Sequence, residues 1–553
     1  MVNLKVKPFH LDEEAIQWVN ETLRELSLEE KVGQLFITVD LPFDTGAKKD
    51  LLSIGPGGVH VFGFSPNATK QHQAAIIRDL QKRSKVPLLV SGDLENGGQG
   101  GAADGTNLAS NMQLAAANDP DLATSFGAAI EAEGHAMGFN WVYGPVIDIN
   151  YNYQNPIVNI RAFGDTPGIV EQTALPVMNA IQKNNRMAAC VKHWPGDGMD
   201  DRDQHKVLTN NTLTMKEWRE TYGRVYKSAI ENGVKTIMSA HITLPSYYEE
   251  LGITDVRTKH TPGSLSSELN MKLLREELGF NGLIVSDATS MIGMTSFGRR
   301  KDIIPQCIAS GVDMFLFTNN MQEDFQAMLQ GVQDGVLTEE RLNEAVTRIL
   351  ALKASLGLHL TLADERDLDV VGSADHLQLA AEIASKSVTL VKDTQGLLPL
   401  TPQKQKRILL LAASDEASFF ADKAATGDEF ARMLSEEGFT VVREYDVKEE
   451  GNEIDAVVFL VQKSPGFMQN SMRLSPQETG GLFKWYPTQV PTIFISLGNP
   501  YTLYELPSMP TMINAYNATL AVQKEIIRCM IGKQPFRGES PIDAFCGLEW
   551  AKL

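Results

Sequence analysis

The sequence predicts an α/β protein in two parts, a (β/α)8 TIM barrel followed by a smaller α/β sandwich domain. Two observations support this: short β-rich segments alternate with helix-like segments over about 320 residues, and polar side chains repeatedly follow the apolar segments. A chain of 553 residues is also too long for one ordinary core, so two domains are expected. The competing topology for such an alternating chain is a doubly wound sheet.

Short apolar segments rich in β-branched or aromatic residues are expected to form the barrel strands. These segments are Gly33–Val39, Gly58–Gly63, Pro87–Gly92, Trp141–Ile149, Met187–His193, Val234–His241, Gly282–Asp287 and Val312–Thr318. Helix-like stretches, with apolar residues at three- and four-residue spacing, separate most of them. Examples of these stretches are Thr69–Arg83, Asp121–Met137, Gly168–Asn184, Met215–Glu231 and Leu265–Leu278.

A charged connector, Leu362–Gly372, is expected to separate the barrel domain, residues 1–365, from the second domain, residues 366–553. The second domain begins with a helical run, Asp375–Ser387. Its expected strands are Val388–Val391, Arg407–Ala413, Ala456–Val461 and Thr492–Ser496. They carry few acids and histidines, so a packing or substrate-framing role is favoured for this domain.

The composition indicates a globular protein, because 43% of the residues are hydrophobic and 22% are charged. The net charge of −19 disfavours nucleic acid or an anionic membrane as a partner. The four cysteines show no zinc-site spacing, and reduced thiols are expected rather than disulfides. Neither an apolar secretory signal nor a membrane-spanning run is visible, so a cytoplasmic location is expected unless a signal has been removed.

The segment from Val191 to His205 is the most informative part of the chain, since it places two histidines and four carboxylates directly after an apolar stretch. The stretch Met187–Val191 is expected to be a buried strand, and Pro195 ends regular pairing. In parallel barrels, active sites lie at the carboxyl ends of the strands. The sequence therefore predicts chemistry on the loop that follows this strand.

Asp203 and His205 are two residues apart, so on an extended segment their side chains can pair. Such a carboxylate fixes the imidazole tautomer and favours its charged form, which suits a proton donor. The alternative is a solvated acidic loop, since isolated Asp-x-His tripeptides are common. A calcium loop fits poorly, because counting from Asp197 places Arg202 at position six and Leu208 at position twelve.

Polar residues also follow the other predicted barrel strands, as a catalytic face at the strand ends would require. They are Asp93 and Glu95, Asp148, Lys192 and His193, His241, Asp287, and Asn319 with Asn320. Any single one can be a helix cap or a solvated loop residue, but their repetition favours one site. The glycine-rich piece Glu95–Gly101 lacks the Gly-Lys-Ser/Thr of a phosphate cradle, so a loop that approaches a ligand closely is the better interpretation.

Several longer motifs lie between Asp93 and Met314. They are Asp93-x-Glu95-x-Gly97-Gly98, Arg161-x-Phe163-Gly164-Asp165, Lys192-His193-Trp194-Pro195-Gly196 through Asp203-x-His205, Ala240-His241-Ile242, and Leu274–Asp287 followed by Gly311–Met314. Together they resemble the family 3 glycoside hydrolases, and within them the β-N-acetylglucosaminidase branch. The Lys-His-x-Pro-Gly run that ends in Asp-x-His distinguishes this branch from the β-glucosidases of the same family.

The resemblance implies that Asp287 is the catalytic nucleophile and that His205, supported by Asp203, is the acid/base. It also implies that four residues bind the hydroxyls of a terminal sugar: Asp93, Arg161, Lys192 and His193. The residue chemistry agrees, because a carboxylate that ends an apolar strand is costly without partners and can attack an anomeric carbon to give a covalent glycosyl-enzyme. His205 would replace the second carboxyl of the usual scheme.

Three departures from the family pattern are Glu95-Asn96-Gly97-Gly98-Gln99 for the usual Glu-Gly-Gly-Arg, Asp197 for a common histidine, and Ala288 for a common aspartate. The expected function is a retaining exo-β-N-acetylglucosaminidase acting on cell-wall or chitin-derived oligosaccharides. A phosphorylase remains an alternative, because a neutral histidine base repels phosphate less than a carboxylate would. A non-catalytic sugar-binding protein is the third possibility. No metal or organic cofactor is called for, and the oligomeric state stays open.

Overall fold

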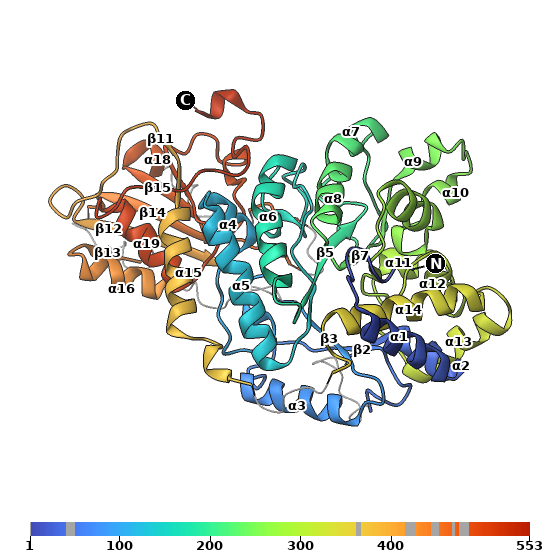
Figure 1. Ribbon diagram of the computed structural model, residues 1–553. Coiled ribbons are helices and arrows are strands. Elements are labelled where there is room, and N and C mark those ends of the chain that lie inside the picture. The colour runs from blue at the N-terminus through green and yellow to red at the C-terminus, as the bar shows by residue number, and fades with distance from the viewer. Residues whose placement is uncertain are drawn as a thin grey trace. The chain divides into compact units, whose positions relative to one another are not determined.

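The computed structural model describes residues 2–39, 50–360, 366–414, 427–443, 453–466, 471–474 and 486–552 (Figure 1). The chain forms two compact units. The first comprises Met1–Asn107, Ala123–Ile149 and Val170–Leu377, and the second comprises Leu108–Leu122, Asn150–Ile169 and Gln378–Leu553. Two short segments that we expected in the barrel domain therefore group with the second unit, and an independent domain boundary at residue 365 stays a prediction. Residues 361–365 of the expected connector lie outside the described residues.

The first unit is built on an eight-stranded parallel sheet with the strand order β10-β1-β2-β3-β4-β5-β7-β9. Its strands are β1 (Phe36–Val39), β2 (Gly58–His60), β3 (Leu89–Gly92), β4 (Trp141–Val142), β5 (Ala188–Trp194), β7 (Thr236–Ser239), β9 (Leu283–Ser286) and β10 (Phe315–Leu316). A parallel bridge between Val285 and Met314 connects β9 to β10, the two ends of this order. The sheet is thus a (β/α)8 barrel, as predicted, and each strand falls within an expected segment except β5, which extends one residue beyond it to Trp194.

Helices follow the strands along the chain (Figure 1). They are α1 (Glu13–Glu25), α2 (Leu28–Gln34), α3 (Lys70–Arg83), α5 (Pro120–Met137), α6 (Pro167–Gln182), α7 (Met215–Glu220), α8 (Tyr222–Glu231), α9 (Pro245–Glu250), α10 (Val256–Lys259), α11 (Ile292–Thr295), α12 (Arg300–Ala309), α13 (Met321–Gln333) and α14 (Glu339–Ser355). The stretch Glu268–Glu277 is a π-helix, and the short strands β6 (Thr209–Asn210) and β8 (Ile242–Thr243) pair with each other.

Most element boundaries shift by a few residues, and at two places the kind of structure differs from the prediction. Gly33 was expected to start a strand, but it lies in α2. This helix begins with a capping box in which Ser27 and Glu30 bind each other's backbone amides. The single helix expected over Met215–Glu231 is broken at Thr221, whose φ of −121° and ψ of −95° are not helical. The Thr221 hydroxyl donates to the backbone carbonyl of Glu217 at 2.7 Å, which offers the chain a local alternative to continued helix.

The second unit has a six-stranded sheet with the order β11-β16-β15-β14-β12-β13, parallel except for β11 against β16. Its elements are α4 (Asn111–Ala116), α15 (Ala374–Ser387), β11 (Thr389–Asp393), β12 (Arg407–Ser414), α16 (Asp428–Glu436), β13 (Thr440–Val442), β14 (Ala456–Gln462), α18 (Tyr486–Gln489), β15 (Thr492–Ser496), β16 (Thr511–Asn514) and α19 (Leu520–Met530). The prediction missed β13 and β16, which are short.

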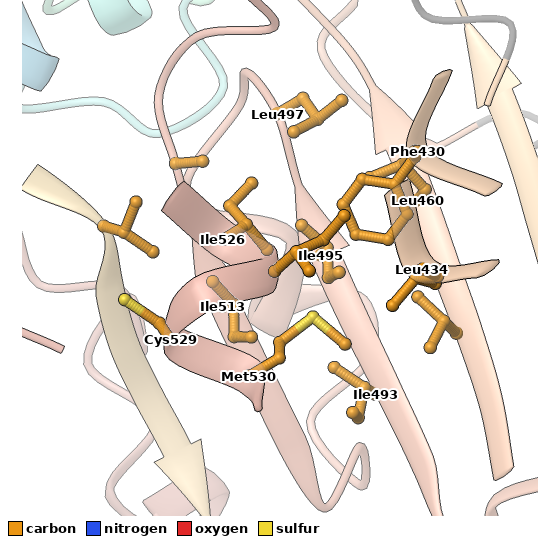
Figure 2. Packing of buried hydrophobic residues seen from close by; sticks show 14 of the residues in the cluster. Phe430, Leu434, Leu460, Ile493, Ile495, Leu497, Ile513, Ile526, Cys529 and Met530 are labelled. Carbon is orange, nitrogen blue, oxygen red and sulfur yellow. The ribbon is translucent and has the colours of Figure 1, made fainter. Parts of the chain in front are cut away.

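Apolar side chains cover both faces of this second sheet. On one face, Phe430 and Leu434 from α16 and Ile526 and Met530 from α19 pack with strand residues such as Ile495 (Figure 2). A second cluster, which includes Phe459 and Phe494, lies on the alternate strand positions. The unit is therefore an α/β sandwich, as predicted.

The four cysteines, Cys190, Cys307, Cys529 and Cys546, are all free thiols. Burial raises the pKa of the Cys190 thiol to about 12, so it remains protonated. None of the helices in the described ranges is both long enough and apolar enough to cross a membrane.

Candidate active site

Most of the predicted site residues gather at the carboxyl ends of the barrel strands, within the first unit. Asp93 follows β3, Lys192 and His193 lie near the carboxyl end of β5, and Asp287 follows β9. Asp203 and His205 lie on the loop that β5 leads into. Because the strands are parallel, their carboxyl ends open on one face of the barrel, which is the face that carries catalysis in this fold.

Asp287 sits where a buried strand meets that face, and only 9% of its surface is exposed. Its backbone amide donates to the Ser239 carbonyl at 2.9 Å, and its Oδ1 accepts from the Ala288 amide at 2.7 Å. Burial by itself would raise the pKa of this carboxyl, but the electrostatic influence of His193, His241 and His205 and the hydrogen bond from the Ala288 amide outweigh burial and lower the pKa overall. Asp287 is therefore an ionised carboxylate at neutral pH, the form that a nucleophile requires.

Asp203 and His205 form the pair that their spacing predicts. His205 Nδ1 donates to Asp203 Oδ1 at 2.6 Å, and the His205 backbone amide donates to the same oxygen at 2.9 Å. The Asp203 side chain is 1% exposed, whereas that of His205 is 21% exposed. Since the carboxylate can only accept, it keeps a proton on Nδ1 and makes Nε2 the nitrogen that can gain or lose one.

The loop that carries His205 is hydrogen-bonded to the segment that follows Asp287. The amide of Ile292 donates to the His205 carbonyl at 3.0 Å, and the amide of Gly293 donates to the Gln204 carbonyl at 3.2 Å. These two contacts attach the backbone of the His205 loop to the segment that follows Asp287, and the electrostatic influence of His205 lowers the pKa of Asp287. The alternative interpretation of Asp-x-His was a solvated acidic loop. Asp203 is instead buried and hydrogen-bonded to His205.

Lys192 lies between two carboxylates that both follow β3. Its Nζ is 2.6 Å from Glu95 Oε1 and 3.5 Å from Asp93 Oδ1, and its side chain is 4% exposed. Asp93 keeps 29% of its side chain exposed and lies 3.6 Å from His60 Nε2. An ammonium and a carboxylate held side by side can hydrogen-bond adjacent hydroxyls of a sugar, one donating and the other accepting.

His193 repeats the carboxylate–imidazole arrangement with Asp148, which is fully buried. His193 Nδ1 donates to Asp148 Oδ2 at 2.6 Å, while the backbone amides of His193 and Asp197 donate to Asp148 Oδ1 at 3.0 and 2.8 Å. Asp148 therefore fixes both the ring of His193 and the start of the acidic loop. Its position after β4 was noticed in the sequence, but its pairing with a histidine was not predicted.

Arg161 belongs to the second unit, where it ends a 3-10 turn (Asn159–Arg161). Its Nη1 donates to the Ile157 carbonyl at 3.1 Å, and its own carbonyl accepts from Asn111 Nδ2 at 2.7 Å. Its expected role in sugar binding stays a prediction.

Glu95, Asp148, Asp197 and Gln204 contact the predicted site residues or one another, although no individual role was predicted for them. Glu95 and Asp148 were expected at the strand-end face, because both follow predicted strands. The other two are loop residues whose partners are set by the fold. Within the described ranges, the structure contains no group of three or more histidine, cysteine, aspartate or glutamate side chains arranged to hold a metal ion.

The raised pKa of Asp197 predicts how the stability of the folded protein depends on pH. Burial and the negative charges of Asp148 and Asp203 raise its pKa to about 7, although His193 and the Gly198 amide oppose them. The folded protein therefore keeps a proton that the unfolded chain releases near pH 4, so this carboxyl makes folding less favourable as pH rises from about 4 to 7. Asp197→Asn should gain free energy of unfolding relative to wild type, and the gain should grow from pH 5 to pH 8 by about 2 kcal/mol.

Denaturant unfolding of both proteins between pH 5 and pH 8 measures this difference. Asp200→Asn, on the same loop, is the control. Hydrogen bonds from Arg202 lower the pKa of Asp200 despite burial, so the effect of this variant should not change over the same pH range. A gain for Asp197→Asn that is flat or falls with pH would contradict the prediction.

The fold and the site define a class: a barrel enzyme with an ionised aspartate and imidazole–carboxylate pairs at one face. The chain matches the description "Glycosyl hydrolase family 3 N terminal domain" over residues 27–352. A beta-N-acetylglucosaminidase/beta-glucosidase of Cellulomonas fimi is 40% identical over 571 residues, covering 100% of this chain and 99% of that protein. The chain therefore belongs to glycosyl hydrolase family 3, which confirms the resemblance carried by its motifs and makes it a glycoside hydrolase.

Solved structures agree with the fold. The structure titled "Beta-glucoside phosphorylase BglX" is 38% identical and superposes with a TM-score of 0.91 over 99% of both chains. A family 3 beta-N-acetylglucosaminidase from Paenibacillus sp. str. FPU-7 is 25% identical, with a TM-score of 0.81 over 94% of this chain and 99% of that one. Both full-length matches include the second unit as well as the barrel.

Proposed function

We propose that the chain is a retaining, exo-acting β-glycosidase that removes terminal β-linked N-acetylglucosamine from cell-wall or chitin-derived oligosaccharides. The observation that carries this proposal is that Asp287, whose pKa is lowered, and His205, whose tautomer Asp203 fixes, lie on two segments at the barrel face that backbone hydrogen bonds join. The name of the Cellulomonas fimi relative supports the donor sugar and adds β-glucosides as a second donor class.

In the proposed first step, an oxygen of Asp287 attacks the anomeric carbon while the bond from that carbon to the leaving oxygen breaks. His205 gives its Nε2 proton to the departing oxygen, and the imidazole becomes neutral. In the second step, His205 takes a proton from a water molecule whose oxygen attacks the same carbon, and the bond to Asp287 breaks. Two inversions keep the β configuration. Asp93, Lys192, His193 and Arg161 are proposed to bind the sugar hydroxyls.

Phosphorolysis is the second candidate, and a specific comparison favours it: the β-glucoside phosphorylase structure covers 99% of this chain. After the first step the base is a neutral imidazole rather than a second carboxylate, so an incoming phosphate dianion meets less repulsion. Phosphate oxygen would then attack the anomeric carbon in place of water and release a sugar 1-phosphate.

One experiment tests the donor and the acceptor together. The enzyme is incubated with 4-nitrophenyl β-N-acetylglucosaminide or β-glucoside, with and without inorganic phosphate, and the products are identified by NMR and mass spectrometry. We expect turnover of the N-acetylglucosaminide with the β-anomer of the free sugar as first product. A sugar 1-phosphate that replaces the free sugar would establish the second candidate. An α-anomer as first product, or no turnover of either donor in either buffer, would overturn the proposal.

A further inference from the structure

Gln204 lies between the two members of the acid/base pair, Asp203 and His205, and is 1% exposed. Its side chain makes contacts of its own with the barrel. Gln204 Oε1 accepts from the backbone amide of His241 at 3.0 Å, and Nε2 donates to Asp197 Oδ2 at 3.5 Å. A buried amide is kept in place by such contacts, because leaving its donor or acceptor unpaired is costly. Gln204 thus joins the start of the loop, at Asp197, to the end of β7.

His241 continues this chain of contacts toward Asp287. Its Nδ1 lies 2.8 Å from the Ser264 hydroxyl, and its Nε2 donates to the backbone carbonyl of Ala288 at 3.0 Å. Ala288 is the residue directly after Asp287, and its amide binds the Asp287 carboxylate. Hydrogen bonds therefore run from Asp197 through Gln204 and His241 to the backbone that carries Asp287.

The loop backbone is fixed on a second side at the same point. Gly293 approaches Gln204 so closely that a Cβ there would lie 2.7 Å from the Gln204 carbonyl oxygen and 2.8 Å from His241 Cβ. The hydrogen bonds from Gly293 and Ile292 to the carbonyls of Gln204 and His205 depend on this close approach. The loop is thus attached by side-chain contacts to β7 and by backbone contacts to the segment after β9.

We propose that Gln204 is a positioning residue that holds the imidazole of His205 toward Asp287 before a substrate arrives. The inference rests on the proposed function, since it assigns a purpose to the geometry of that same acid/base pair. Proton transfer requires a donor within hydrogen-bond reach of the leaving oxygen, and small displacements of a catalytic group lower rates strongly. Loss of the Gln204 contacts should therefore weaken acid assistance selectively and leave nucleophilic attack by Asp287 largely intact.

The test compares Gln204→Met, which keeps the size of the side chain and removes its polar atoms, with two other variants. Gln204→Glu keeps an oxygen that accepts from the His241 amide. Gln182→Met is the matched control: Gln182 also binds backbone groups, the Gly233 carbonyl at 3.1 Å and the Lys235 amide at 2.9 Å before β7 and the Ala189 amide at 3.4 Å at the start of β5. It belongs to α6, and these contacts lie at the amino ends of the strands rather than at the site. For each variant, kcat/KM is measured for a 2,4-dinitrophenyl glycoside and for the methyl glycoside of the same sugar.

For Gln204→Met we expect kcat/KM to fall about 30-fold or more for the methyl glycoside and less than about threefold for the dinitrophenyl glycoside. Gln204→Glu should recover part of the loss, and Gln182→Met should change both substrates equally, if at all. Equal losses for the two substrates in Gln204→Met, or a selective loss in Gln182→Met, would overturn the inference. If Gln204→Met does not fold, Gln204→Leu, which also removes both polar atoms, is compared with Gln182→Met by the same ratio.

His205→Ala, measured on the same two substrates, separates this inference from the proposed function. If its loss is selective for the methyl glycoside and that of Gln204→Met is not, the positioning role is wrong while the acid/base assignment stands. If neither variant is selective, the acid/base assignment itself is wrong, and the positioning role is overturned with it.

Discussion

Replacing Asp287 with asparagine should lower kcat/KM for every glycoside substrate by a factor of about 10⁴ or more, equivalent to about 5 kcal/mol of transition-state stabilisation. Asparagine has nearly the same shape, and its carbonyl oxygen can still accept from the Ala288 amide, so the fold should persist. The amide cannot form the covalent bond to the anomeric carbon, which is why no substrate escapes the effect. The measurement is the initial rate with a dinitrophenyl glycoside. This donor is the most reactive, so residual activity would be easiest to detect with it.

Asp302→Asn serves as the control for this substitution. Asp302 is an exposed carboxylate in the same unit, paired with Arg299 at 2.6 Å, and removing its charge should change the rate less than twofold and stability by less than about 0.5 kcal/mol. Thermal unfolding of both variants shows whether the fold is kept. An Asp287→Asn or Asp287→Ala protein that is folded and retains a tenth of the wild-type rate would eliminate Asp287 as the nucleophile.

The barrel could be predicted from the sequence because its strands are buried on all sides and appear as continuous apolar runs. The seven residues of β5 are all buried, and the apolar stretch Met187–Val191, which overlaps its beginning, predicts a strand for that reason. The elements that were missed or misplaced lack such a signal. The strand β13 has three residues, one of them exposed, and the break at Thr221 depends on a hydroxyl–carbonyl contact inside an otherwise helical pattern.

The site could be predicted only where neighbours in sequence are neighbours in space. The Asp203–His205 pair follows from a spacing of two residues, and the position of Asp287 follows from the end of an apolar strand. The Asp148–His193 pair joins residues 45 positions apart, and the sequence names the residues without showing that they meet. The raised pKa of Asp197 likewise depends on burial beside Asp148. In the sequence alone, Asp197 is indistinguishable from an ordinary solvated loop carboxylate.

Replacing His205 with alanine should affect substrates according to their leaving groups. We expect kcat/KM to fall about 10²- to 10⁴-fold for methyl glycosides and disaccharides, whose leaving alkoxides need a proton, and about tenfold or less for dinitrophenyl glycosides, whose leaving group departs as a stable anion. Asp203→Asn should show the same order with smaller losses, because asparagine does not stabilise the charged imidazole that Asp203 binds at 2.6 Å. The measurement is the dependence of log kcat/KM on leaving-group pKa.

Sodium azide distinguishes a lost acid/base from a distorted site in the His205→Ala protein. With a dinitrophenyl donor, the covalent intermediate still forms, but its hydrolysis lacks a base. Azide needs no base, so it should restore turnover and yield the β-glycosyl azide, detectable by mass and by the anomeric coupling constant. His72→Ala, which removes an exposed histidine on α3, should respond to neither azide nor leaving group. A uniform loss across leaving groups without azide rescue would mean that a residue other than His205 carries the proton.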